Sequence, residues 1–307
     1  MIRPDKRWFG VLSAILLALA VFCSPEDKAG PDEPLELAVC GWDSVFVLRL
    51  DSPMDKAGRI VWSWCAADAP ELPDSMKSKF ASTDECKPVN GGRAILITSS
   101  SDGVALVERE TKKVLFWASA VNAHSADLLP DGMVAVAASH RPDSPGDRLI
   151  LFAPGTPGRE IANYELSWAH GVVWDDFRRK LYALGDDVVV VYKLVHGGIS
   201  GLEEVERIIL PDLGGHDLYP VPGLSILTIS TANHCWVLDR NSGRLSTHTN
   251  RLAEMANIKC ISVSPKTAQT AYIQAEGDDW WATRIRMLDP INTVLMPERR
   301  IYKVRWF

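Results

Sequence analysis

From about residue 35 onward, short apolar runs alternate with turns rich in Pro, Asp, Asn and Gly. These runs are too short for helices and are rich in aliphatic residues, which predicts β-strands. Five of them follow a turn at similar intervals along the chain: 93–99, 133–139, 180–185, 225–230 and 270–275. Regular spacing of short strands predicts an all-β protein built from repeated units.

One position in this pattern carries a repeated residue type. His124, His170 and His216 are each 46 residues apart, and a similar step reaches Asp84 backwards and Lys259 forwards. A period of 40 to 46 residues, with several short strands per unit and no helical segment, is typical of a β-propeller. Equivalent positions of a propeller converge on its axis, so we expect these side chains to face one another.

The number of repeats predicts the number of blades. Five units start near these residues, whereas the chain before them supplies only three runs, at 35–41, 45–50 and 59–64. The last run, Ile301 to Trp306, can supply the missing strand by pairing with Leu35 to Cys40. We therefore predict a six-bladed β-propeller with four-stranded blades, closed by N- and C-terminal strands in one blade, with seven blades as the alternative. Such closure removes unpaired sheet edges.

The first residues have the pattern of an export signal. Arg3, Lys6 and Arg7 precede an apolar run at 8–22 that is short for a membrane span, which predicts a signal peptide at residues 1–20. The protein is then expected to be periplasmic or extracellular.

A charged, Pro-rich segment without apolar periodicity follows at 21–34 and is expected to be a flexible leader. Cys23 offers lipid attachment as an alternative route to the membrane, although Phe22 before it is larger than the residue usual at that position. Residues 35–307 are expected to form a single propeller domain.

Charge and cysteine content narrow the partners. Removal of residues 1–20 takes away three basic residues and one acidic residue, so the formal charge changes from −6 to −8. An acidic monomer without a basic stripe argues against nucleic acid as a partner.

Apart from Cys23, the chain has five cysteines, and they show no Cys-x-x-Cys spacing. This favours buried free thiols and leaves a disulfide open. The five are Cys40, Cys65, Cys86, Cys235 and Cys260.

Antiparallel strands place certain loops on the same face as the histidines. These loops are polar, acidic and aromatic, and they span 42–43, 99–102, 139–143, 185–187, 233–234 and 276–281. If Trp280 and Trp281 lie in a strand, at most one of them can be on this rim. Most other tryptophans are expected to fill the space between blades: Trp62, Trp64, Trp117, Trp168, Trp236 and Trp306.

Three functions are compatible with the converging residues. His124, His170 and His216 could bind a divalent metal such as Mn, Zn or Ca. They could instead bind an acidic ligand without a metal, helped by Asp84, Lys87, Lys259 and Trp281. In the third interpretation each histidine has a structural role and holds its blade to the next through a loop carbonyl.

Several segments, among them NAHSADLLPDG, HGVVWDDFRRKLYALG and GGHDLYPVPG, resemble a family of exported bacterial propellers of uncharacterised function. The resemblance covers about residues 35–307 and implies the propeller fold. A more distant similarity to oligogalacturonate lyases implies manganese ligation by His124, His170 and His216.

Two classes of function remain open at this point. In a binding protein, Trp280 and Trp281 would stack on a carbohydrate whose acidic group lies at the channel mouth. In a metal-dependent uronate lyase, the metal would neutralise the carboxylate, and a neighbouring base would remove the adjacent proton. Candidate bases are Lys259, Lys87, His140 and His234. No Ser-His-Asp triad, phosphate-binding glycine loop or HExxH motif is recognisable.

Overall fold

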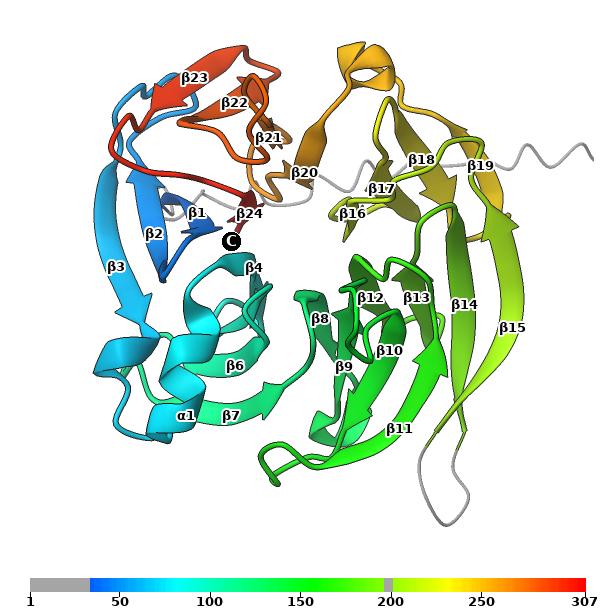
Figure 1. The fold of residues 1–307 in the computed structure, drawn as a ribbon. Coiled ribbons are helices and arrows are strands. Elements are labelled where there is room, and N and C mark those ends of the chain that lie inside the picture. Colours follow the sequence, from blue (N-terminus) through cyan, green and yellow to red (C-terminus); the bar gives the residue numbers. More distant parts are fainter. Residues whose placement is uncertain (1–33, 196–200) are drawn as a thin grey trace, which may run out of the picture. The chain divides into compact units, whose positions relative to one another are not determined.

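The computed structural model describes residues 34–195 and 201–307. Six four-stranded antiparallel sheets surround a central axis and form a six-bladed β-propeller (Figure 1). The predicted fold class and blade number are confirmed. The predicted signal peptide, Cys23 and the leader up to residue 33 lie outside the described residues.

In each blade one strand lies nearest the axis, and the other three follow outward in the order given. Blade 1 contains β24 (Lys303–Trp306), β1 (Leu35–Gly41), β2 (Ser44–Leu50) and β3 (Arg59–Cys65). Blade 2 contains β4 (Thr83–Val89), β5 (Ala94–Ser99), β6 (Gly103–Glu108) and β7 (Val114–Ser119). Blade 3 contains β8 (Ala123–Leu128), β9 (Val134–Ala138), β10 (Arg148–Phe152) and β11 (Glu160–Glu165).

The second half of the ring repeats this plan. Blade 4 contains β12 (Gly171–Asp175), β13 (Lys180–Leu184), β14 (Val188–Val195) and β15 (Gly201–Ile209). Blade 5 contains β16 (Asp217–Pro220), β17 (Ile226–Ser230), β18 (Cys235–Asp239) and β19 (Arg244–Thr247). Blade 6 contains β20 (Ile258–Val263), β21 (Thr270–Gln274), β22 (Arg284–Leu288) and β23 (Asn292–Leu295).

The ring closes through the two terminal strands of blade 1. β24 pairs antiparallel with β1, with Leu37 opposite Trp306 and Cys40 opposite Lys303. The predicted pairing is confirmed, although Ile301 forms a bridge with Ala282 of blade 6 instead. The last strand therefore connects the first blade to the sixth and leaves no inner strand unpaired.

The hydrophobic core lies between neighbouring blades. Along β5, Ile95 and Ile97 pack toward blade 1, whereas Ala94 and Leu96 pack toward blade 3. This follows from the period of two in a strand, which sends successive side chains to opposite faces of the sheet. Because both faces are covered, the sequence of the strand is almost continuously apolar.

Short helices interrupt the all-strand pattern, so the expectation of no helical segment was wrong. They are η1 (Ala66–Asp68), α1 (Asp74–Lys77), η2 (Ser78–Phe80), η3 (Pro130–Gly132) and η4 (Arg251–Glu254). The first three connect β3 to β4, where the buried Phe80 meets Trp64 edge-on at 5.4 Å between ring centroids. In the described residues, no helix has the length and apolar character needed to cross a bilayer.

The cysteines of the described chain are free thiols, as favoured by the sequence. Four of them are buried and Cys65 is partly exposed. Cys40 and Cys86 lie against the same backbone carbonyl of Lys303, at 3.7 and 3.9 Å. They act here as small apolar side chains in the core.

β-bulges at the start of three inner strands position the residues at the axis. The register shifts between Thr83 and Glu85 in β4, so that Asp84 is the extra residue. The same shift occurs at His124 in β8 and at Lys259 in β20. A bulge breaks the alternation of a strand and redirects a side chain, so the extra residue and its successor can both point toward the axis.

Candidate functional site

Six side chains meet where the inner strands begin, and we call them the mouth layer. In order around the ring they are Tyr302, Asp84, His124, His170, His216 and Lys259. The ring centroids of His124 and His170 are 4.1 Å apart, and those of His170 and His216 are 5.3 Å apart. The predicted convergence of the three histidines, with Asp84 and Lys259 beside them, is confirmed.

Two of the imidazoles are oriented by local backbone carbonyls. The Nδ1 atoms of His124 and His170 lie 2.9 Å from the carbonyl oxygens of Asn122 and Trp168. If each Nδ1–H donates to its carbonyl, each Nε2 is left as an acceptor. Burial lowers the pKa of both rings well below 6.5, and the charge of a neighbouring histidine adds to this shift. Both rings are therefore neutral at neutral pH.

These carbonyls belong to the residue two positions before each histidine. In the structural interpretation, each histidine contacts a loop of the next blade. The bonds to the carbonyls of Asn122 and Trp168 are not contacts of this kind. A contact between blades occurs at His170 Nδ1, which lies 3.2 Å from the hydroxyl of Ser139. The backbone contacts fix the orientation of the rings rather than joining blades.

Lys259 and His216 form a second pair within the mouth layer. The Lys259 ammonium lies 3.1 Å from His216 Nε2. In the described part of the chain, no carboxylate forms an ion pair with Lys259 and the buried Nδ1 of His216 has no hydrogen-bond partner. Burial, followed by the charge of Lys303, lowers the pKa of Lys259 to about 8. Burial, followed by the charge of Lys259, lowers the pKa of His216 to about 3.

Asp84 is the carboxyl group of the mouth layer. Its side chain is 2% exposed, and burial raises its pKa to about 7. The backbone N–H of Ser100 donates to one of its oxygens, while the other lies 3.9 Å from His124 Nε2. A buried carboxyl group that titrates near neutral pH can accept or donate a proton at this site.

Tyr302 is the member of the mouth layer that the sequence analysis missed. Its ring lies 6.1 Å from His124 and 5.5 Å from Trp280, measured between centroids. A further step along the repeat would have found it, because Tyr302 is 43 residues after Lys259, just as Lys259 is 43 residues after His216. The repeat therefore marks one residue in every blade.

A second set of side chains lies deeper along the axis, and we call it the buried charge layer. It consists of Glu85, Asp217, Lys303 and Arg305, all at most 2% exposed. Arg305 contacts both carboxylates, with Nε 2.8 Å from Glu85 and Nη2 2.6 Å from Asp217. Lys303 Nζ lies 3.2 Å from Asp217. Two acids and two bases thus balance one another.

Lys87 does not lie in the mouth layer, so its expected place beside the histidines was wrong. Its ammonium contacts Asp127 at 3.2 Å and the carbonyl of Val172 at 2.6 Å. Lys87 is three positions after Asp84, which is roughly 10 Å along a strand. Lys87 instead lines a hollow of about 300 Å³ that also includes the β4–β5 turn.

Aromatic side chains surround the mouth layer at the junction of blades 1 and 6. Trp42 stacks on Trp280 at 5.0 Å and meets Trp281 edge-on at 5.7 Å. The guanidinium of Arg300 lies over Trp42 and Trp281, at 4.6 and 5.1 Å. The expectation for Trp280 and Trp281 depended on a strand, and both residues instead lie in the loop between β21 and β22.

A second aromatic pair occurs at the junction of blades 3 and 4. The rings of His140 and Trp168 stack at 4.8 Å, and Asp147 holds His140 Nδ1 at 2.8 Å. Trp168 is 46% exposed, so its expected role as a filler between blades was wrong. Its φ of 49° is unusual for a tryptophan and places its side chain at a turn, two positions before His170.

His234 was the other candidate base on this rim. Its Nδ1 lies 3.1 Å from Asp212, and the ring is 5.8 Å from Trp236. Among the described residues, neither His140 nor His234 forms a hydrogen bond or ring contact with a member of the mouth layer. Both are loop residues held by a carboxylate.

The donor atoms of the mouth layer do not form a metal site. Within residues 34–195 and 201–307, no group of three His, Cys, Asp or Glu side chains has an arrangement that could hold a metal ion. The geometry gives a reason, because the ammonium of Lys259 lies against His216 Nε2. The positive charge of this ammonium would repel a metal ion bound at the same nitrogen atom.

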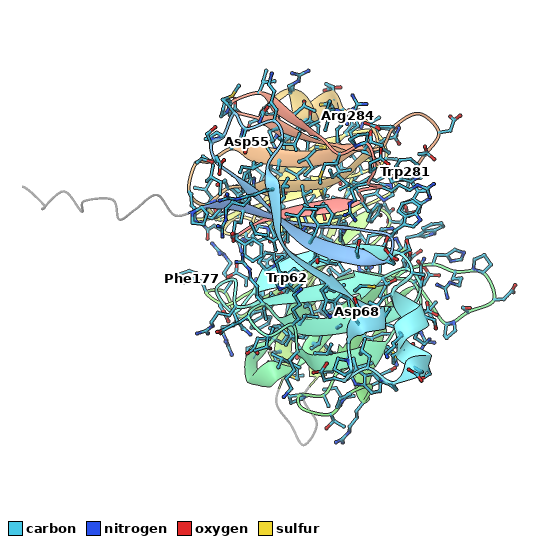
Figure 2. All side chains as sticks on the ribbon, turned by 90° about the vertical axis from the view of Figure 1, so that its left-hand side faces the viewer. Asp55, Trp62, Asp68, Phe177, Trp281 and Arg284 are labelled. Atoms are coloured by element: carbon cyan, nitrogen blue, oxygen red, sulfur yellow. The ribbon has the colours of Figure 1, made fainter. Side chains whose placement is uncertain are left out.

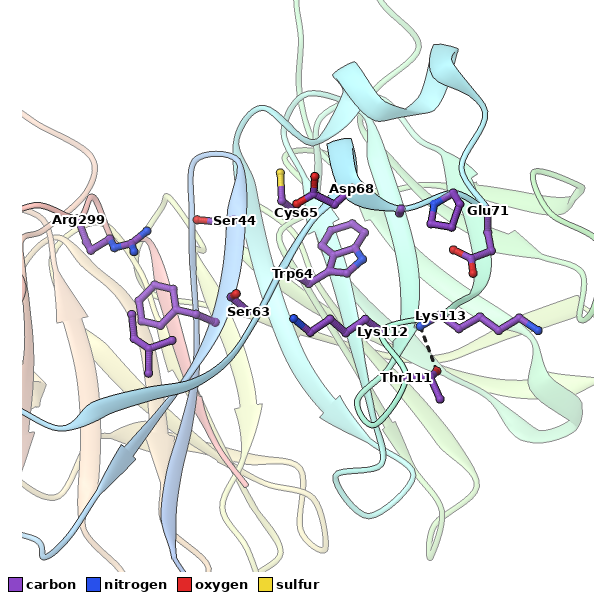
Figure 3. A pocket seen from close by; sticks show the side chains of 14 residues that line it. Ser44, Ser63, Trp64, Cys65, Asp68, Glu71, Thr111, Lys112, Lys113 and Arg299 are labelled. Carbon is purple, nitrogen blue, oxygen red and sulfur yellow. Dashed lines mark hydrogen bonds between the residues drawn. The ribbon is translucent and has the colours of Figure 1, made fainter.

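A separate hollow of about 510 Å³ lies on the flank of blade 1 (Figure 3). It is bounded by β3, the helical connection and the β6–β7 turn, and it contains both acids and bases, among them Asp68, Glu71, Lys112 and Lys113. It includes none of the residues that the repeat marks.

The fold and site define a six-bladed propeller with a histidine-lined mouth layer. The chain belongs to a family of unknown function (DUF6528), whose model matches residues 46–307. This confirms the resemblance to an uncharacterised propeller family, whereas the likeness to oligogalacturonate lyases is not shown. No curated protein matches the sequence.

Two solved structures have a similar fold. A chain in the crystal structure of a nidogen/laminin complex is 14% identical with a TM-score of 0.60, covering 89% of this chain and 98% of that chain. A putative 6-phosphogluconolactonase from Bacteroides uniformis is 14% identical with a TM-score of 0.55, covering 83% and 78%. At these identities the likeness concerns the fold alone.

Proposed function

We propose that the mouth layer binds a carbohydrate that bears a carboxylate, and that the protein is an exported binding module. The observation that carries the proposal is the ammonium of Lys259, which is buried and has no carboxylate partner in the described chain. A buried charge is normally paired, because leaving water is unfavourable for it. A ligand carboxylate would supply the missing partner.

The rest of the mouth layer suits the hydroxyl groups of a sugar. Neutral His124 and His170 offer Nε2 atoms as acceptors, and Asp84 offers a further oxygen. One half of the mouth thus accepts hydrogen bonds, while the ammonium of Lys259 on the other half can donate them. A polyhydroxylated acid matches both halves.

The aromatic rim favours a carbohydrate over a simple organic acid. Trp280 is 43% exposed and adjoins Tyr302 of the mouth layer. Flat indole rings at the edge of a polar site provide an apolar surface on which a sugar ring can stack. No metal takes part in this proposal, since Lys259 contacts the lone pair that the third ligand would need.

Calorimetric titration with galacturonate and glucuronate tests the proposal, with galactose and glucose as neutral comparisons. We expect the acids to bind and the neutral sugars to bind at least tenfold more weakly, which is roughly 1.4 kcal/mol. Lys259→Gln should remove this preference. The matched control is Lys56→Gln, an exposed lysine in the β2–β3 turn beside Asp55, on the side away from Trp281 (Figure 2). Equal affinity for acidic and neutral sugars would contradict the proposal.

A further inference from the structure

Two aromatic platforms lie on the rim of the mouth layer. The first platform is Trp42 with Trp280, whose rings are 5° from parallel. The second platform is His140 with Trp168, whose rings are 24° from parallel. Each platform has an exposed tryptophan, with 43% of Trp280 and 46% of Trp168 accessible to solvent.

The order of the blades places the two platforms opposite each other. Trp42 belongs to blade 1 and Trp280 to blade 6, whereas His140 follows β9 of blade 3 and Trp168 precedes β12 of blade 4. Three blades therefore separate the platforms in either direction around a six-bladed ring. The histidines of the mouth layer lie between them.

Both platforms are connected to the mouth layer by direct contacts. The backbone carbonyl of Trp168 lies 2.9 Å from His170 Nδ1, and the ring of Trp280 packs against Tyr302. Asp147 holds His140 through Nδ1 and also accepts the backbone N–H of Trp168, at 2.7 Å. The stacking of Trp168 on His140 and of Trp280 on Trp42 restricts rotation of the two exposed indoles. This reduces the entropy lost when a ligand binds.

Charge at the first platform indicates an anionic ligand there as well. Arg300 lies over Trp42 and Trp281, and within the described chain it forms no ion pair with a carboxylate. Arg300 on the rim and Lys259 in the mouth layer are thus two cations that a ligand could neutralise. A single acidic sugar can pair with one of them, whereas a chain of acidic sugars can pair with both.

We infer that the ligand is a linear oligosaccharide of acidic sugars that crosses the mouth layer from one platform to the other. This inference rests on the proposed function and adds the length of the ligand to it. One carboxylate lies at Lys259 in the centre, and flanking sugar rings stack on Trp280 and Trp168. The affinity then depends on whether the chain is long enough to reach both platforms.

The test is a titration of the full chain with galacturonate monomer, dimer, tetramer and hexamer. We expect affinity to rise with length until both platforms are reached. Trp168→Ala and Trp280→Ala should each reduce the affinity for the hexamer by roughly tenfold. Trp168→Ala should leave the affinity for the monomer nearly unchanged, whereas Trp280→Ala removes the ring next to Tyr302 and should weaken monomer binding as well. Because both indoles are exposed, their removal should not disturb the core.

The matched control is Phe177→Ala, which removes an aromatic ring that is 88% exposed on the face opposite Trp281 (Figure 2). It should leave affinity for every length unchanged. Equal affinity for monomer and hexamer, or an unchanged hexamer affinity in both tryptophan variants, would overturn the inference while leaving the central site intact. If neither the monomer nor any oligomer binds, the proposed function itself is wrong.

Discussion

The mouth layer and the buried charge layer lie next to each other on the same inner strands, yet they differ in how their charges are satisfied. In the buried charge layer, Arg305 and Lys303 neutralise Glu85 and Asp217. In the mouth layer, Lys259 has no carboxylate partner in the described residues. A fully paired network stabilises one structure, whereas buried groups without partners mark a candidate binding site.

Their pKa shifts show the same difference. Although burial alone would raise its pKa, Asp217 has a pKa lowered to about 2 by the charges of Arg305 and Lys303. Asp84 has a pKa raised to about 7, because burial outweighs its hydrogen bonds and the charge of Lys303. Two aspartates close to the same axis thus differ in charge near neutral pH because only one has a guanidinium partner.

The largest expected effect comes from breaking the buried charge layer. Arg305→Met leaves Glu85 and Asp217 with Lys303 as their one close cation, and we expect a loss of about 3–5 kcal/mol in the free energy of unfolding. Urea denaturation measures it. Arg300→Met, an exposed arginine on the rim, should change stability by less than about 0.5 kcal/mol. Equal stabilities for the two variants would refute the assigned structural role.

Removing the Asp84 carboxylate from the mouth layer should instead increase the free energy of unfolding. Burial raises the pKa of Asp84 from its ordinary 3.8 to about 7 in the folded protein, so the unfolded chain loses its proton first. The fold therefore loses stability as the pH rises from about 4 to about 7, and the penalty is constant above that. We expect Asp84→Asn to stabilise the protein by roughly 2–4 kcal/mol at about pH 8 and by nearly nothing at about pH 4. Thermal unfolding across this range is the measurement. A destabilisation at about pH 8 would contradict it.

His170→Ala separates a structural histidine from a metal ligand. The variant leaves the Trp168 carbonyl and the Ser139 hydroxyl without their imidazole partner, which should lower stability by about 1–3 kcal/mol at neutral pH. The pKa of His170 is lowered from 6.5, so below that pH the unfolded chain gains a proton that the folded ring does not. The cost of the substitution should therefore shrink on acidification.

Elemental analysis accompanies the same variant. After incubation with manganese, zinc and calcium, we expect neither wild-type protein nor His170→Ala to retain a metal in stoichiometric amount. A wild-type protein that holds one equivalent of metal, and loses it in the variant, would restore the metal site and the lyase interpretation.

The smallest expected effect concerns the pH dependence of ligand binding. Lys259 must be protonated to pair with a carboxylate, and its pKa is lowered to about 8. Affinity for galacturonate should fall by up to about tenfold per pH unit above the pKa of Lys259 in the free protein, and should level off above its higher pKa in the complex. Lys259→Gln should bind weakly at every pH. A wild-type affinity that is constant from about pH 7 to about pH 10 would argue against pairing at Lys259.

The fold could be predicted well because the repeat appears in the sequence both as a pattern of short strands and as one marked residue per blade. The convergence of His124, His170 and His216 followed from that repeat alone. The sequence analysis misplaced Lys87 because its position along β4 depends on the strand register, and the repeat does not reveal that register. Trp168 was misjudged because its exposure follows from a turn with positive φ, and a tryptophan in an apolar segment gives no sign of that.

The buried charge layer could not be assembled from the sequence either. Arg305 meets Glu85 and Asp217 only after the chain has closed into a ring, and these residues are 220 and 88 positions away from it. The sequence did contain one signal for three of these residues, which is their position next to the residues marked by the repeat. Glu85, Asp217 and Lys303 each directly follow a member of the mouth layer.

Closure of the ring also sets the direction in which the mouth faces. β24 starts at the mouth layer and runs antiparallel to β1, so Leu35 and Phe307 both lie at the opposite end of blade 1. The Phe307 N–H donates to the carbonyl of Glu36 at 3.0 Å, which keeps the two ends adjacent. A propeller coupled to a solid support through Phe307 would therefore present its histidines on the face away from the support.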